Sequence, residues 1–263
     1  MGLLTGKKAL VFGLANNKSI AYGITKALIE HGAEVGLSYA NEVLEKRVKP
    51  IAEELGIKFC EECDLANDEA VAKLFEKIKA EFGTFDILVH SVAFAPRETL
   101  TGRFVETSRE AFLTTMNISV YTLMKLAHEA EPLMNEDGSI MTLTYYGGEK
   151  MIVDYNVMGV AKAALDSTVR YLATDLGSTD KHIRVNAISA GPMKTLSSSA
   201  VGSFKALYAR AINSAPLKRY ADIDDVGNAA VYLGSDLAKN VTGEVLHVDA
   251  GLNSVGIAGL GDK

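Results

Sequence analysis

The most constraining feature of this sequence is a regular alternation of short apolar runs with longer amphipathic segments. Apolar runs of strand length lie at 8–13, 34–39, 59–64, 85–91, 139–144, 184–189 and 245–248. Segments with helical periodicity separate them, at 20–31, 42–55, 68–82, 108–132, 154–176 and 223–233. The runs are continuously apolar, as strands buried on both faces of a sheet are. The pattern predicts a doubly wound α/β fold, with helices on both faces of a parallel sheet.

Local signals support several of these boundaries. Ser19 stands where an N-cap of the 20–31 helix would be, and Gly32 follows that helix as a C-cap signal. Residues 107–110 read Thr-Ser-Arg-Glu, which predicts a capping box at the start of the 108–132 helix. Inside the first helix, Gly23 predicts a close approach of that helix to the sheet.

Length and charge limit the classes of protein that remain. The chain has 263 residues and a formal net charge of -6, so a general nucleic-acid binder is disfavoured. No apolar stretch approaches the length of a membrane span, and we expect a cytoplasmic protein with no membrane partner. Residues 1–263 are expected to form one domain. The irregular stretch 190–216 predicts a substrate lid at about 193–215, the alternative being a surface loop with a helical turn.

The two cysteines raise the question of a metal or redox site. Cys60 and Cys63 lie three apart on a predicted strand, so their side chains point to opposite faces. There is no second cysteine pair, and the five histidines form no cluster with ligand spacing. We therefore expect two reduced thiols and no metal.

The turn after the first apolar run predicts a cofactor site. Gly13 allows a sharp turn, and the helix start at Ser19 and Ile20 offers free N–H groups that suit a pyrophosphate. Small residues are frequent in such turns, so an ordinary strand–helix connection remains the alternative. The second run ends Ser38-Tyr39-Ala40-Asn41, without the Arg or Lys that would hold a 2′-phosphate, which favours NADH. Asp64 ends the third run and could meet adenine or simply start a helix.

Tyr155 and Lys162 carry the chemical prediction. They lie seven residues apart in the predicted 154–176 helix, so both side chains face one side. A tyrosine hydroxyl donates to a carbonyl oxygen, and a nearby ammonium stabilises the ionised phenol. Such a pair also arises by chance in helices, so this spacing alone leaves the catalytic role open.

Several motifs together resemble the short-chain dehydrogenase/reductase superfamily. Most of its members carry a Tyr four residues before the Lys, where this chain has Met158, and a Ser near the position of Tyr145. The pattern Gly13-x5-Ser19-x3-Gly23, with Tyr145-x9-Tyr155 and Lys162, instead resembles the NADH-type branch of bacterial enoyl-[acyl-carrier-protein] reductases. The stretches 90–96, 186–196 and 241–251 resemble the same family.

The resemblance implies a Rossmann-like fold and the reduction of the 2,3 double bond of an enoyl thioester in type II fatty-acid synthesis. It implies catalytic roles for Tyr155, Lys162 and Tyr145, with Tyr145 shaping the acyl site or assisting proton supply. Substrate contacts are implied for Ala95, Tyr145, Tyr155 and Phe204. NADH contacts are implied for Gly13, Ser19, Ile20, Ala40, Asp64, Leu65, Val92, Lys162, Met193, Lys194, Thr195, Leu196 and Ser197.

Partners and rival functions follow from the same resemblance. It implies an acyl carrier protein as the donor of substrate, with Lys205 and Arg210 as the basic residues left near the lid. It also implies a homotetramer built through the helices at 108–132 and 154–176. A carbonyl-reducing enzyme, such as a 3-oxoacyl-thioester reductase, is the first alternative, disfavoured by Met158. A non-catalytic NAD-binding regulator is the second, disfavoured by the presence of Tyr155 and Lys162.

Overall fold

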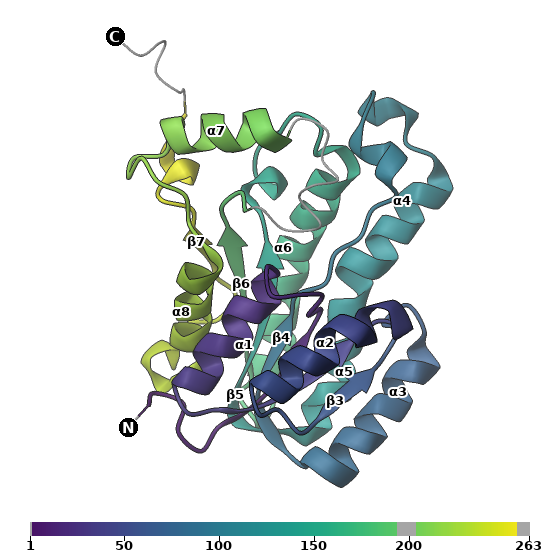
Figure 1. Ribbon diagram of the computed structural model, residues 1–263, viewed down its shortest axis with the longest axis vertical. Helices are drawn as coiled ribbons and strands as arrows, with labels where there is room; N and C mark the ends of the chain where they lie inside the picture. The colour runs from purple at the N-terminus through teal and green to yellow at the C-terminus, as the bar shows by residue number, and fades with distance from the viewer. Residues whose placement is uncertain (1, 194–203, 257–263) are drawn as a thin grey trace.

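Seven parallel strands form one sheet in the described part of this computed structural model, residues 2–193 and 204–256 (Figure 1). Their spatial order is β3-β2-β1-β4-β5-β6-β7, and each neighbouring pair is parallel. The strands are β1 (Lys8–Phe12), β2 (Glu34–Tyr39), β3 (Cys60–Glu62), β4 (Phe85–His90), β5 (Met134–Thr144), β6 (Arg184–Ala190) and β7 (Val245–Val248). The predicted doubly wound sheet is confirmed. Strands are added toward one edge from β1 to β3 and toward the other edge from β4 to β7, so the switch point lies between β1 and β4.

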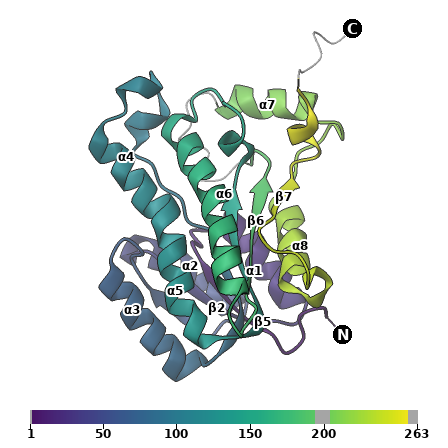
Figure 2. The ribbon, with the colours of Figure 1, turned by 180° about the vertical axis from the view of Figure 1, so that it is seen from behind.

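Helices cover both faces of the sheet, as Figures 1 and 2 show from opposite sides. On one face lie α1 (Ile20–Glu30), α2 (Glu42–Glu54) and α8 (Ile223–Gly234), around a core that includes Ile24, Val48 and Val226. On the other face lie α3 (Asp68–Lys77), α5 (Thr122–Ala130) and α6 (Asn156–Gly177), around Leu74, Leu126 and Leu165. Two further helices, α4 (Arg109–Met116) and α7 (Phe204–Ser214), lie near the end to which the strands point.

The predicted 108–132 helix is wrong as one continuous element. It consists of α4, a π-helical turn at Asn117–Tyr121, α5, and a short 3₁₀ turn. The hydroxyls of Thr115 and Thr122 bond carbonyls four residues earlier, at 2.8 and 2.7 Å, and such bonds loosen the helical ladder on either side of the turn. Ser108 caps α4 by accepting from the Ala111 N–H, while a capping box lies at α8, between Asp222 and Asp225.

Gly23 does not serve the contact that the sequence predicts. A Cβ on Gly23 would lie 2.3 Å from the carbonyl oxygen of Ile223, in α8 rather than in the sheet. On the facing helix, a Cβ on Gly227 would lie 2.7 Å from the carbonyl oxygen of Gly23. The two glycines therefore let α1 and α8 cross with their backbones in contact. The sequence offered no partner for Gly23, because the two helices are about 200 residues apart in the chain.

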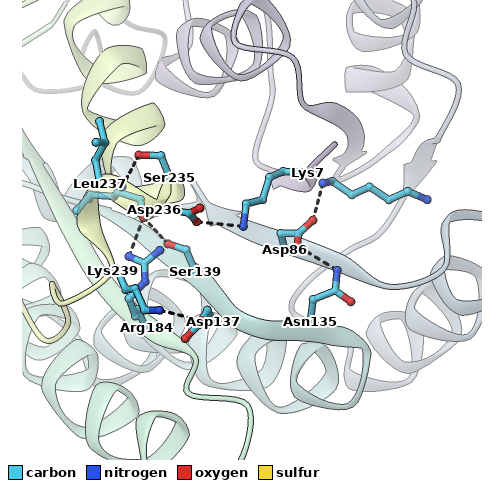
Figure 3. Close-up of polar contacts among 12 residues, drawn as sticks. Lys7, Asp86, Asn135, Asp137, Ser139, Arg184, Ser235, Asp236, Leu237 and Lys239 are labelled. Carbon is cyan, nitrogen blue, oxygen red and sulfur yellow. Dashed lines mark hydrogen bonds and ion pairs between the residues drawn. The ribbon is translucent and has the colours of Figure 1, made fainter. Parts of the chain in front are cut away.

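The amino ends of the strands are closed by polar contacts (Figure 3). Arg184 Nη1 and Ser139 Oγ both donate to the carbonyl of Leu233, at 2.8 and 2.9 Å, and so fix the end of α8 to β5 and β6. Asn135 Nδ2 donates to Asp86 at 3.0 Å across β5 and β4. These contacts hold the amino ends of β4, β5 and β6 and the end of α8 together.

Two further expectations concern thiols and membranes. Cys60 and Cys63 are free, and burial raises their pKa values to about 11 and about 12, so both are protonated thiols at neutral pH. Within residues 2–193 and 204–256, none of the helices has the length and apolar character needed to cross a membrane.

Adding a methyl group at the α1–α8 crossing tests the role of Gly23. Gly23→Ala should lower the free energy of unfolding by about 2–3 kcal/mol, because the contacted atom is backbone and the helices must separate. Gly177→Ala is the control, since its Cβ meets only an ordinary contact at 3.8 Å and the change should be neutral or slightly stabilising. Urea unfolding measures both; equal stability of the two variants would contradict this account of the crossing.

Candidate active site

A cavity of about 690 Å³ opens at the carboxyl ends of the strands. Its walls come from the turns after β1, β4, β5 and β6 and from the beginning of α6. The predicted site residues that line it are Gly13, Ser19, Ile20, Val92, Ala95, Tyr145, Tyr155, Lys162 and Met193. Residues from five separate parts of the sequence thus share one cavity, and the predicted phenols and ammonium are among them.

Other predicted site residues lie elsewhere or outside the described residues. Ala40, Asp64 and Leu65 follow β2 and β3 at the same edge of the sheet, but they do not line this cavity. Asp64 is exposed and its carboxylate accepts from the Ala66 N–H at 2.9 Å, whereas Leu65 is buried. Lys194, Thr195, Leu196 and Ser197 lie outside the described residues, as does the side chain of Phe204 at the start of α7.

The turn after β1 has a shape that only glycine permits at its first position. Gly13 has a φ of 98°, and a Cβ there would lie 2.1 Å from the carbonyl oxygen of Ser91. The Ser19 hydroxyl does not cap α1 as predicted; it donates to the carbonyl of Asn16 at 2.6 Å. Because no side chain of the described residues caps α1, its first N–H groups face the cavity mouth as donors for an anion. These features fit the pyrophosphate of a dinucleotide.

Tyr155 stands where a strained turn meets the start of α6. The predicted helix start at Asp154 is wrong, because α6 begins at Asn156 and Tyr155 occupies the position before it. Asp154 and Asn156 have φ values of 62° and 40°, a left-handed conformation that is costly for residues other than glycine. The Asn156 side-chain amide donates to the carbonyls of Thr99 and Gly102, at 3.1 and 3.4 Å. These bonds tie the turn to the segment that forms the adjacent cavity wall.

The two tyrosine rings contact each other edge to face. The centroids of Tyr145 and Tyr155 are 5.0 Å apart, with the ring planes at 77°. Gly147 fits beside both rings, since a Cβ there would lie 2.5 Å from Tyr155 Cδ1 and 3.1 Å from Tyr145 Cδ1. Burial raises the pKa of Tyr145 to about 12 and that of Tyr155 still further, with the neighbouring Tyr145 adding to the shift. Both hydroxyls are therefore protonated donors at neutral pH.

Lys162 brings a buried positive charge to the floor of the cavity. Its side chain is 5% exposed, and Nζ donates to the carbonyl of Leu143, at the end of β5, at 2.7 Å. Burial lowers its pKa to about 8, while the carboxylate of Asp166, one helical turn further along α6, acts in the opposite direction. The ammonium is thus the major form at neutral pH, and it loses its proton just above.

Beside Lys162 lies a buried polar network that the sequence did not reveal. His90 Nε2 and Nδ1 are each 2.8 Å from a hydroxyl, those of Thr122 and Thr142 respectively. Because Thr122 donates to the carbonyl of Ile118, its oxygen accepts from Nε2–H, and Thr142 then donates to Nδ1 at 2.8 Å rather than to the His90 carbonyl at 3.3 Å. Burial and the Lys162 charge lower the pKa of His90 to about 3, so the ring stays neutral. The positions of His90, Thr122 and Thr142 in the sequence do not indicate that these three side chains meet.

A metal-dependent site has no support in the described ranges. Among residues 2–193 and 204–256, no three His, Cys, Asp or Glu side chains gather closely enough to hold an ion.

Fold and site together define a reductase of the Rossmann-like class, with a dinucleotide turn and a Tyr–Lys pair at one cavity.

Comparison with known proteins gives the family. The family model described as enoyl-(acyl carrier protein) reductase matches residues 13–253. The enoyl-[acyl-carrier-protein] reductase [NADH] FabI of Rickettsia felis is 54% identical, over 97% of each chain. The chain therefore belongs to the enoyl-(acyl carrier protein) reductase family, and the family predicted from the sequence is confirmed.

Solved structures agree with this assignment. The enoyl-(acyl-carrier-protein) reductase of Anaplasma phagocytophilum in complex with NAD has a TM-score of 0.94 and 49% identity, over 98% of each chain. The Bacillus cereus reductase with NADP⁺ and indole naphthyridinone has a TM-score of 0.95 and 48% identity, over 98% of this chain and all of that one. The same fold thus accompanies either dinucleotide.

Gly147 offers a test of how tightly the tyrosine rings are placed. Gly147→Ala should lower kcat for the enzyme's reaction by about 10–100-fold, because the added methyl overlaps Tyr155 and displaces its hydroxyl. Dinucleotide binding and the unfolding midpoint should change little, and Gly177→Ala should leave kcat unchanged. A fully active Gly147→Ala variant would show that the ring position is not set by this contact.

Proposed function

We propose that this chain reduces the 2,3 double bond of enoyl thioesters carried by acyl carrier protein, with NADH as the reductant. The observation that carries the proposal is the meeting of Tyr155 and Lys162 in one cavity with Met158, a side chain without a hydroxyl, four residues before Lys162. The activity and reductant are those in the name of the Rickettsia felis relative, which matches along nearly the whole chain. A single reductase domain over residues 1–263 is part of the proposal.

The cofactor would lie along the carboxyl ends of β1 to β6. Bound NADH supplies the hydride that the β-carbon of the substrate accepts. The turn at Gly13, Ser19 and Ile20 would hold the pyrophosphate on the free N–H groups of α1. Lys162 would bond the ribose hydroxyls. The remaining proposed contacts are Ala40, Asp64, Leu65, Val92 and residues 193–197.

Tyr155 supplies the hydrogen bond on which catalysis depends. Negative charge collects on the thioester oxygen as the β-carbon gains hydride, and a protonated phenol stabilises that oxygen by donation. Because its pKa is raised by burial, Tyr155 keeps its proton at neutral pH until the oxygen becomes basic. Tyr145, whose ring contacts Tyr155, would shape the acyl site and fix the orientation of that phenol. Ala95 and Phe204 would contact the acyl group.

A carbonyl-reducing enzyme is the alternative that the cavity must exclude. Such an enzyme needs a donor beside the carbon that receives hydride, at the level of Met158. Met158 is buried and lines the cavity, so at that level it presents a thioether instead of a phenol. An NAD-binding regulator without catalysis would have no use for Tyr155 and Lys162 in the lining of one cavity.

The end of β2 favours NADH over NADPH. Ala40 is exposed and carries no donor, and the Asn41 side chain accepts from the Leu44 N–H as the cap of α2. Lys46 and Arg47 lie further along α2 and are exposed to solvent. The Bacillus cereus reductase holds NADP⁺ in the same fold, so the choice depends on such local residues and not on the architecture.

The proposal extends to partners and location. Helix α7 lies across the carboxyl ends of β6 and β7 (Figures 1 and 2), and Tyr208 in α7 contacts Tyr220, 5.6 Å between ring centroids. We infer a lid at 193–215 that includes α7, with Lys205 and Arg210 as basic contacts for the acidic carrier. A cytoplasmic homotetramer, formed through α4, α5 and α6, completes the proposal.

Reaction type is tested by two substrates measured in parallel with NADH. Crotonyl-thioester should be reduced at least about a hundredfold faster than acetoacetyl-thioester, because the phenol stands away from the level of Met158. Tyr155→Phe should lower kcat on crotonyl-thioester by about 10²–10³, as loss of one oxyanion donor does. Tyr171→Phe, an exposed tyrosine on α6, is the matched control and should be silent. Equal rates on both substrates would overturn the proposed function.

The pKa of Lys162 gives a pH test of its role. Since its folded pKa of about 8 is below the ordinary value of 10.5, the ammonium is present below pH 8 and is lost above it. If the ammonium bonds the ribose, the Kd for NADH should rise about tenfold between pH 7 and pH 9. Lys162→Met should bind NADH weakly at every pH, while the exposed Lys46→Met should behave as wild type. A wild-type Kd that is constant over this range would remove Lys162 from cofactor binding.

A further inference from the structure

A buried hydroxyl bonds the loop that follows β4 at Phe94. Ser119 Oγ accepts from the N–H of Phe94 and donates to the carbonyl of the same residue, both at 3.0 Å. Ser119 is 0% exposed and belongs to the π-helical turn between α4 and α5. A single side chain therefore satisfies both backbone groups of a residue in the cavity wall.

Apolar packing cannot replace this attachment. The Phe94 ring is 48% exposed, and its neighbours Ala93 and Ala95 have side chains too small to anchor a loop. All three residues line the cavity. The hydroxyl of Ser119 is thus the specific contact that fixes how far this wall stands from the opposite one.

The same hydroxyl is placed against the catalytic helix. Ser119 Oγ lies 4.0 Å from the sulfur of Met158, which is buried one turn after Tyr155 on α6. Ser119 thus lies between the loop and the helix, so that moving one relative to the other breaks its contacts. Ser119 is buried within the π-helical turn, and such turns often occur at functional sites.

We propose that Ser119 is a positioning residue for the acyl-thioester site, setting the distance of the 93–96 wall from Tyr155 through its paired bonds to Phe94. The proposal rests on the proposed function, since it assumes that an enoyl thioester lies against this wall. In this proposal the 93–96 wall contacts the substrate equally in the bound ground state and in the transition state. Its loosening should therefore weaken substrate binding and leave the chemical step almost intact.

Ser119→Ala tests the proposal by steady-state kinetics with crotonyl-thioester and NADH. KM for the thioester should rise about tenfold, equivalent to about 1.4 kcal/mol, with kcat changed less than about threefold. The Kd for NADH, measured without substrate, should stay within about twofold, because the pyrophosphate turn and Lys162 are untouched. Thr115→Val is the matched control: it removes another buried hydroxyl from the same helical region, one that bonds only its own helix.

A second measurement does not depend on turnover. Hydrogen exchange of the 91–97 segment should be faster in Ser119→Ala than in wild type and unchanged in Thr115→Val, because only the first loses the acceptor of the Phe94 N–H. Unchanged exchange, or a KM effect shared by Thr115→Val, would overturn the positioning role. Failure of the proposed function would look different: the wild-type enzyme would not reduce crotonyl-thioester, whatever the exchange result.

Discussion

The site depends on one buried positive charge, the ammonium of Lys162. A charge with 5% of its side chain exposed is costly unless it is hydrogen-bonded. The Leu143 carbonyl, near the end of β5, supplies that bond at 2.7 Å, and Asp166 supplies an opposite charge from α6. Because the carbonyl comes from the sheet and the lysine from a helix, the bond also fixes α6 over the end of the sheet.

The same charge determines the state of its neighbours. His90 is kept neutral partly by Lys162, so the two buried bases do not compete for protons, and the threonines around His90 set which ring nitrogen carries the hydrogen. The floor of the cavity therefore holds the Lys162 ammonium beside the neutral His90, with the Asp166 carboxylate one turn further along α6. Such an environment favours negative charge forming above it and costs no rearrangement when it does.

Much of this fold could be predicted from sequence, because strand and helix periods are local properties. The apolar runs gave all seven strands of the described sheet, and the positions of Tyr155 and Lys162 gave the two side chains that meet in the cavity. Contacts between segments that are distant in the sequence could not be predicted. Gly23 meets α8, and Ser119, within a π-helical turn, meets Phe94. Neither depends on a pattern within one element, so neither leaves a periodic signal.

Tyr155 lines the cavity, but the helical geometry from which this residue was predicted is incomplete. The spacing of seven residues assumes a continuous helix, in which the phenol would stand one turn beyond the level of Met158. In the structure the helix stops short of Tyr155, and left-handed residues on both sides of it redirect the backbone. The helix therefore does not determine where the hydroxyl lies. Its position is set by the Tyr145 ring, by the absent side chain of Gly147 and by the bonds of Asn156 to the adjacent cavity wall. Because packing against the turn places Tyr155, its hydroxyl can stand at a distance from Lys162 that a tyrosine within a continuous helix could not reach. An oxygen two carbons away from the site of hydride addition requires that freedom of placement.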